Sequence, residues 1–142
     1  FVAAAHAGWR GLAGQAGIGV LESVFHHFPD PSRLGHERTA AKIMAWLGPC
    51  IGPDAYEVGS EVKAAFEASD PLAAASFTPA AAGKWLADLQ ALARQRLRAL
   101  GVSQIFGNDG SPSWCTLRNP ARYFSHRRDG VCGRMAACIW LQ

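Results

Sequence analysis

The amino-acid sequence predicts an α/β (α+β) fold in which a layered mixed β-sheet is flanked by helices. Two observations favour this fold class. Short apolar runs of strand length alternate with segments of helical periodicity, and the strand-like runs lead into turns that contain glycine. The chain has 142 residues, of which 49% are hydrophobic and 18% are charged, so it has the size and composition of one globular domain.

The first 28 residues predict a strand followed by a helix. Phe1–Ala5 is a small apolar run that indicates a buried strand, and the turn after it begins with His6. Apolar residues then recur at helical spacing over Gly11–Phe28, although each of the four glycines in this stretch costs up to about 1 kcal/mol relative to alanine. The adjacent pair His26–His27 does not favour a metal site, because neighbouring helical residues point in different directions.

The middle of the chain predicts a loop, a strand and a helix. Pro29–Thr39 is a polar loop, and Ile43–Leu47 indicates a second buried strand. Two Gly-Pro steps in Gly48–Pro53 predict a rigid loop at the end of that strand. We expect a helix over Ser60–Ala68, with the serine as its N-cap.

The second half predicts the clearest helix and two further strands. Ala73–Gly83 is rich in alanine, contains a proline and indicates a loop. Lys84–Leu100 carries one stripe of leucines and predicts a helix that Gly101 ends. Val102–Phe106 and the final apolar run, Gly133–Leu141, are β-compatible and predict strands.

The positive charge of the chain is concentrated near its C-terminus. The formal net charge is +3, whereas Arg118–Gln142 alone holds five arginines and one acid, Asp129. Arginine is well suited to binding phosphate and carboxylate groups, so this concentration favours an anionic small molecule or a structural arginine network. It does not form the long basic face that nucleic acid would require.

The cysteines and the hydropathy pattern bear on location and reactivity. Cysteines 50, 115, 132 and 138 show no Cys-x-x-Cys spacing, which favours free thiols in the cytoplasm. Cys50 lies between two Gly-Pro steps, where we favour a buried structural thiol over a nucleophile. No apolar run approaches 18 residues, so we expect no membrane span.

Three segments together resemble one family. They are His6-Ala-Gly-Trp-Arg-Gly11, the loop Gly48–Gly59 with Tyr-Glu-Val-Gly at its end, and Cys115–Ala137 with Phe-Ser-His-Arg-Arg-Asp-Gly inside it. In this order they resemble the YfiH/laccase-domain family, whose members have been described as polyphenol oxidases, peptidoglycan editing factors and zinc-dependent purine nucleoside enzymes. The resemblance runs along essentially the whole chain and implies a YfiH-like layered α/β fold.

The resemblance also implies a metal site. The family binds its metal, zinc with copper as the alternative, through two histidines and one cysteine, and leaves a position open for water or substrate. His6 matches one of these ligands; the other two belong to family segments expected outside this chain. Cys50 and Cys115 do not match the cysteine ligand. We therefore expect residues 1–142 to be a single YfiH/laccase-like domain that lacks its N-terminal part and to be inactive alone.

The implied activity is zinc-dependent phosphorolysis of adenosine, inosine and related purine nucleosides, or deamination of adenosine, with the nucleoside and phosphate as small-molecule partners. The expected catalytic residues are His6, Arg10 and His126. Trp9, Tyr123 or Phe124 is expected to stack on the purine. Arg10 with Arg127 or Arg128 is expected to bind the phosphate. Three alternatives stay open at the level of single residues: an arginine network on Asp129 that braces the turn, a His126 that hydrogen-bonds backbone, and a His6 that is a satisfied histidine at a strand end.

Other functional classes also remain open. Copper-dependent oxidation of phenols suits His and Cys ligands, although five scattered histidines without a His-x-His pair argue against a laccase. Hydrolytic editing of peptidoglycan precursors and a non-catalytic fragment are the further alternatives.

Overall fold

The computed structural model of the chain describes residues 1–27 and 43–141. The loop predicted over Pro29–Thr39 and the predicted helix end at Phe28 lie outside these described residues. Within them, no helix is long and apolar enough to cross a membrane.

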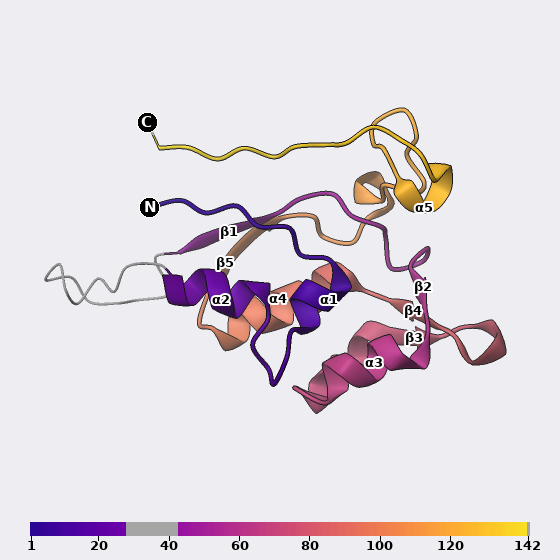
Figure 1. Cartoon of the computed structure of the whole chain (residues 1–142), viewed down its shortest axis with the longest axis horizontal. Coiled ribbons are helices and arrows are strands. Elements are labelled where there is room, and N and C mark those ends of the chain that lie inside the picture. Colours follow the sequence, from indigo (N-terminus) through magenta and orange to yellow (C-terminus); the bar gives the residue numbers. More distant parts are fainter. Residues whose placement is uncertain (28–42, 142) are drawn as a thin grey trace, which may run out of the picture.

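Two small sheets and the helices that cover them form the described structure (Figure 1). Strands β1 (Met44–Leu47) and β5 (Gln104–Gly107) pair in parallel, with Met44 opposite Gln104 and Leu47 opposite Gly107. Strands β2 (Glu57–Val58), β4 (Trp85–Ala87) and β3 (Phe77–Pro79) form an antiparallel sheet in that order. Parallel and antiparallel pairing beside helices confirms the predicted fold class, and β1 and β5 confirm two of its strands.

The predicted helix over Lys84–Leu100 is shorter than expected. Helix α4 spans Leu89–Ala99, and the Asp88 carboxylate caps it by accepting a hydrogen bond from the Ala91 amide at 2.7 Å. The prediction was wrong at the N-terminal end because the residues before Asp88 form β4, whose backbone pairs with strands on both sides. Gly101, with φ of 84°, ends the helix as predicted.

Helix α3 (Ser60–Glu67) packs the core of the antiparallel sheet. Val62 and Phe66 are its buried residues, and the Phe66 ring lies 6.0 Å from that of Phe77, centroid to centroid. Ser60 is the first helical residue instead of the predicted N-cap, because its hydroxyl turns outward: it donates to the Gly83 carbonyl and accepts from the Trp85 indole.

The loop predicted over Ala73–Gly83 contains regular structure. A 3-10 helix (Pro71–Ser76) precedes β3, and a 3-10 turn (Ala81–Gly83) follows it. The prediction was wrong because the segment is stabilised by contacts that composition does not reveal. The Asp70 carboxylate caps the first turn through the Leu72 amide at 2.9 Å, and β3 gains its partner from β4.

The single helix predicted over Gly11–Phe28 is interrupted. Helix α1 (Trp9–Ala13) and helix α2 (Val20–His27) flank a tight turn in which Gly14 and Gly17 adopt φ of 69° and 80°. The Glu22 carboxylate fixes the far side of this turn. It accepts from the Gly19 amide at 2.7 Å and forms an ion pair with Arg96 of α4 at 2.9 Å.

Two predicted strands are not strands in the described structure. Phe1–Ala5 and Gly133–Leu141 carry no strand pairing, and their large apolar side chains are exposed, from 40% for Val2 to 77% for Phe1. A strand needs a neighbour to pair with, and neither segment has one among the described residues. Trp46 on β1 and Phe106 on β5 are also more than half exposed, so apolar surface is exposed on this sheet as well.

We predict that Gly14→Ala destabilises the protein more than Gly17→Ala. Both glycines have positive φ, which costs an alanine about 1–2 kcal/mol. A Cβ at Gly14 would also collide with the Ile18 carbonyl, whereas a Cβ at Gly17 would meet nothing within 4 Å. Urea unfolding of the two variants measures the difference. Equal losses would show that the close approach at Gly14 does not constrain the turn.

Candidate active site

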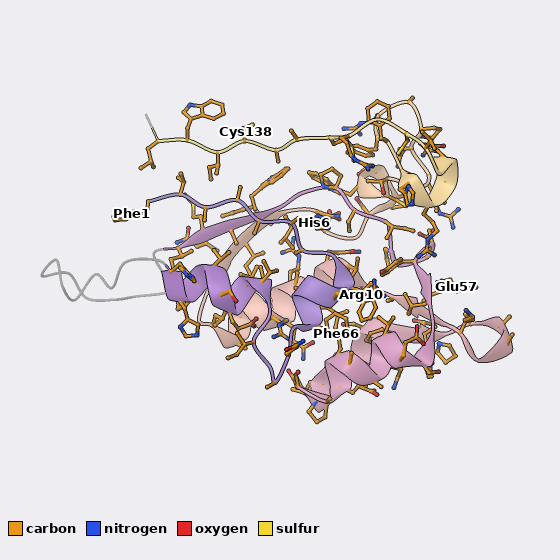
Figure 2. The ribbon with its side chains drawn as sticks, in the orientation of Figure 1. Phe1, His6, Arg10, Glu57, Phe66 and Cys138 are labelled. Carbon is orange, nitrogen blue, oxygen red and sulfur yellow. The ribbon has the colours of Figure 1, made fainter. Side chains whose placement is uncertain are left out.

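His6 lies three residues before α1, on the segment that begins at the N-terminus (Figure 2). Its side chain is exposed and makes no hydrogen bond or ion pair within the described residues. Gly8 approaches the ring closely, because a Cβ there would lie 3.1 Å from His6 Nε2. The segment therefore presents an unpaired imidazole that can bind a metal ion or a substrate.

The fit of the described residues to a metal ion is limited to one ligand. His6 has a free ring nitrogen, as a ligand requires. Within residues 1–27 and 43–141, no group of three His, Cys, Asp or Glu side chains could hold a metal ion. Because a catalytic zinc site uses three protein ligands, any site at His6 needs ligands from outside these residues.

Helix α1 carries the aromatic and cationic candidates that follow His6. The Arg10 guanidinium lies 4.6 Å from the centroid of the Trp9 ring, so one face of that ring is occupied by the cation. Arg10 is exposed and has no carboxylate partner among the residues the structure describes. Figure 2 shows it on α1, near the middle of the view, with Glu57 farther to the right.

Arg128 is fully engaged within the protein. Nε and Nη2 form two hydrogen bonds of 2.7 Å to the Asp129 carboxylate, Nη1 donates to the carbonyls of Thr116 and Leu117, and Nη2 donates to that of Tyr123. A guanidinium has five N–H donors, and these contacts use five. The hydrogen bonds from Arg128 hold the pKa of Asp129 below its usual range. The geometry thus matches the structural brace and leaves no donor for phosphate.

His126 begins the short helix α5 (His126–Asp129), which Ser125 caps through the Arg128 amide. Its Nδ1 is hydrogen-bonded to the Gly130 carbonyl, as expected for the alternative in which His126 bonds to the backbone. The side chain is exposed, so Nε2 is the nitrogen left for a proton-transfer role.

Arg127 points away from Arg128 and toward the antiparallel sheet. Its Nη1 donates to the Glu57 carbonyl at 3.2 Å, and its guanidinium lies 5.5 Å from the centroid of the Tyr56 ring. No carboxylate pairs with it among the described residues, and its remaining N–H groups are exposed. Of the two candidates for a partner of Arg10, only Arg127 keeps donors available.

The two aromatic candidates of the C-terminal segment differ in exposure. Tyr123 is partly buried, with the Arg122 guanidinium 5.4 Å from its ring centroid. Phe124 is 51% exposed, and one side of its ring lies against Gly133, where a Cβ would be 2.7 Å from Cε2. Phe124 therefore offers more open ring surface for stacking than Tyr123 or Trp9.

A family model described as a multi-copper polyphenol oxidoreductase laccase matches residues 1–142. The chain belongs to this family. The match confirms the resemblance to the YfiH/laccase-domain proteins.

Relatives within the YfiH/laccase family carry a different activity in their names. The chain is 50% identical over 140 residues to a protein named purine nucleoside phosphorylase YfiH from Escherichia coli (strain K12), covering 99% of this chain and 51% of that protein. It is 45% identical over 142 residues to a purine nucleoside phosphorylase of Pseudomonas aeruginosa, covering 99% and 52%. The chain thus spans about half the length of these curated relatives.

Solved structures agree on the fold. A crystal structure of a Neisseria meningitidis protein superimposes with a TM-score of 0.72 at 43% identity, covering 89% of this chain and 46% of that one. YlmD from Geobacillus stearothermophilus gives 0.66 at 32% identity, covering 89% and 43%. The YfiH-like fold class is therefore confirmed.

Cys50 and Cys115 lie in surroundings typical of structural thiols. Burial raises the pKa of the Cys50 thiol to about 11, and its sulfur accepts a hydrogen bond from the Asn108 amide at 3.3 Å. Cys115 is 1% exposed and its sulfur accepts from the Gly52 amide at 3.2 Å. A thiol with so high a pKa is a poor nucleophile at neutral pH, which supports the structural interpretation of Cys50.

Tyr56 is a residue that the sequence analysis did not assign to the site. It lies within the Gly48–Gly59 segment that carries the family resemblance, but that resemblance attached no role to it. In the structure it is 8% exposed, and the charges of both Arg127 and Arg10 act on its hydroxyl. The Arg127 guanidinium therefore lies against Tyr56, and Arg10 is close enough for its charge to act on the same side chain.

We predict that Arg128→Ala lowers the midpoint of thermal unfolding more than Arg134→Ala, because Arg134 is exposed and makes none of the contacts that Arg128 makes. Since the folded pKa of Asp129 is depressed, its ion pair contributes stability above the unfolded pKa of about 3.9, and that contribution is lost as the pH falls through the folded pKa. The difference between wild type and Arg128→Ala should shrink over that acidic range in thermal melts. A difference independent of pH would show that only the carbonyl contacts matter.

Proposed function

We propose that this chain contributes to a zinc-dependent purine nucleoside phosphorylase site of the YfiH type, acting on adenosine, inosine and related nucleosides. The observation that carries the proposal is the pair Arg10 and Arg127. The Arg127 guanidinium lies over the Tyr56 ring, and the charge of Arg10 acts on the same tyrosine. Neither arginine has a carboxylate partner among the described residues. The chain is 50% identical over 140 residues to a protein named purine nucleoside phosphorylase. Two free guanidinium groups suit a phosphate dianion.

In phosphorolysis, a phosphate oxygen forms a bond to C1′ of the ribose while the bond from C1′ to the purine nitrogen breaks. The base leaves with the bonding electrons and takes up a proton. Arg10 and Arg127 bind and orient the phosphate, which replaces a bimolecular encounter by a positioned attack. Exposed Phe124 stacks on the purine, and His126 Nε2 serves as the proton donor or acceptor.

The metal has a limited place in this proposal. His6 contributes one ligand, and the further ligands come from residues beyond those described. When bound, zinc supplies Lewis-acid polarisation, and for adenosine deamination it also lowers the pKa of a bound water. We propose further that residues 1–142 form one YfiH-like unit that requires those additional ligands for turnover.

Oxidation of phenols is the second candidate, since the family description names polyphenol oxidoreductases. Three assays on the natural full-length protein separate the activities. Inosine with phosphate tests for hypoxanthine and ribose 1-phosphate, adenosine in water tests for inosine and ammonia, and a phenol with dioxygen tests for oxidation. Oxidation of the phenol without phosphorolysis would overturn the proposal.

We predict that His6→Ala in the full-length protein loses bound zinc and phosphorolysis together, because the imidazole is proposed as a ligand. His27→Ala is the matched control, since His27 is also exposed but lies at the end of α2, where its ring is hydrogen-bonded to the Ser23 carbonyl. Metal analysis and turnover of both variants provide the measurement. Stoichiometric zinc in His6→Ala would refute the ligand assignment.

We predict that Arg127→Ala raises the KM for phosphate about tenfold or more and leaves the KM for the nucleoside unchanged, because in the proposed site the guanidinium binds the phosphate and not the nucleoside. Arg122→Ala is the control, since Arg122 lies against Tyr123 instead of Tyr56. Steady-state kinetics with each substrate varied in turn distinguish the two effects. A loss of thermal stability with unaltered kinetics would assign Arg127 to a structural role.

A further inference from the structure

Tyr56 is held rigidly at the junction of the Gly48–Pro53 loop and the antiparallel sheet. Its backbone amide donates to the Gly52 carbonyl at 3.0 Å, and its carbonyl accepts from the Ala87 amide of β4 at 3.0 Å. The side chain packs in the hydrophobic core with only 8% of the residue exposed. Backbone and ring are therefore fixed, and the hydroxyl has a defined position.

The hydroxyl of this buried tyrosine has no hydrogen-bond partner among the described residues. The phenolic group of a buried tyrosine normally finds one, because leaving it unpaired costs free energy. The oxygen is not fully buried. Among the described side-chain polar atoms, the one that is both fully buried and without a hydrogen-bond partner is Gln90 Nε2, not the Tyr56 hydroxyl. The Tyr56 hydroxyl is therefore unpaired but not completely enclosed, and its donor is available to a ligand.

The charges around this hydroxyl indicate which kind of ligand fits. Burial raises the pKa of Tyr56, and the positive charges of Arg127 and Arg10 offset this effect only in part. The phenol therefore stays protonated at neutral pH and is available as a donor. The nearby Asp54 carboxylate is paired with Arg118 at 2.9 Å, and Glu57 offers Arg127 only its backbone carbonyl. Donors predominate, so the position suits an oxyanion.

We propose that the Tyr56 hydroxyl is the third donor of an oxyanion site formed with Arg10 and Arg127, and that this site binds inorganic phosphate. The inference rests on the proposed function and extends it by a substrate-binding residue. The unpaired hydroxyl, the Arg127 guanidinium over the same ring, and Arg10, whose charge acts on this tyrosine, offer the tetrahedral anion donors from three separate elements: the residue preceding β2, α5 and α1. Arg127 also gains orientation from the tyrosine ring at 5.5 Å.

Direct titration with inorganic phosphate tests the inference without any nucleoside or metal. Isothermal titration calorimetry should show that Tyr56→Phe, which keeps the ring and removes the hydroxyl, raises the Kd for phosphate about tenfold, equivalent to ~1.4 kcal/mol. Tyr123→Phe makes the same chemical change at the other tyrosine and should leave the Kd unchanged. Equal phosphate affinity in wild type and Tyr56→Phe would overturn the inference.

A second measurement on the wild-type chain does not depend on the folding of a variant. The chain contains two tyrosines, so ¹³Cζ-labelled tyrosine gives two NMR signals. Phosphate should shift the Tyr56 signal and leave the Tyr123 signal in place; a titration that moves neither signal would refute the site.

The outcomes also separate this inference from the proposed function. If Arg10→Ala and Arg127→Ala weaken phosphate binding while Tyr56→Phe does not, the tyrosine inference is wrong and the arginine pair stands. If wild type binds phosphate with the predicted tyrosine dependence but the full-length protein phosphorolyses no nucleoside, the oxyanion site stands and the proposed function fails.

Discussion

The parallel pairing of β1 with β5 is the constraint on which the arrangement of the candidate site depends. The pairing continues beyond the two strands as an isolated bridge between Cys50 and Cys115, where the Thr116 amide donates to the Cys50 carbonyl at 2.9 Å. Because parallel strands end at the same edge, the loop after β1 and the segment after β5 meet there. The first leads to Tyr56 and the second to Arg127. Residues 71 positions apart in sequence are thereby placed in contact.

The adjacent arginines 127 and 128 show how local geometry divides two roles that composition cannot separate. Both lie on one turn of α5, so their side chains point in different directions. Arg128 uses its five N–H donors in hydrogen bonds to the Asp129 carboxylate and to three backbone carbonyls that precede it in the chain. Arg127 turns to β2 and keeps most of its donors. The brace holds the turn rigid, and this rigidity is what fixes the direction of the free guanidinium.

Sequence patterns predicted the elements whose stabilisation is local and failed where it is not. The leucine stripe and Gly101 located the end of α4, and the apolar run at Ile43–Leu47 located β1, because periodicity and glycine conformation are properties of neighbouring residues. β4 was missed because its pairing with β2 and β3 overrides a helical pattern that continues through Trp85. Tyr56 was missed for the same kind of reason: its contact with Arg127 is a tertiary contact between two segments that lie far apart in the sequence.

The residues of the candidate site differ in how firmly the backbone holds them, and this difference bears on how a metal would bind. The hydrogen-bonded backbone fixes Tyr56, directly before β2, and Arg127 on α5, so an oxyanion site built on them is preorganised. His6 lies on an exposed segment without strand pairing among the described residues. A ligand on such a segment loses conformational freedom when it binds, and that cost lowers metal affinity unless further contacts order the segment first. The contacts that order residues 1–8 would therefore control the proposed metal binding, whereas the proposed phosphate binding would depend on a part of the fold that is already rigid.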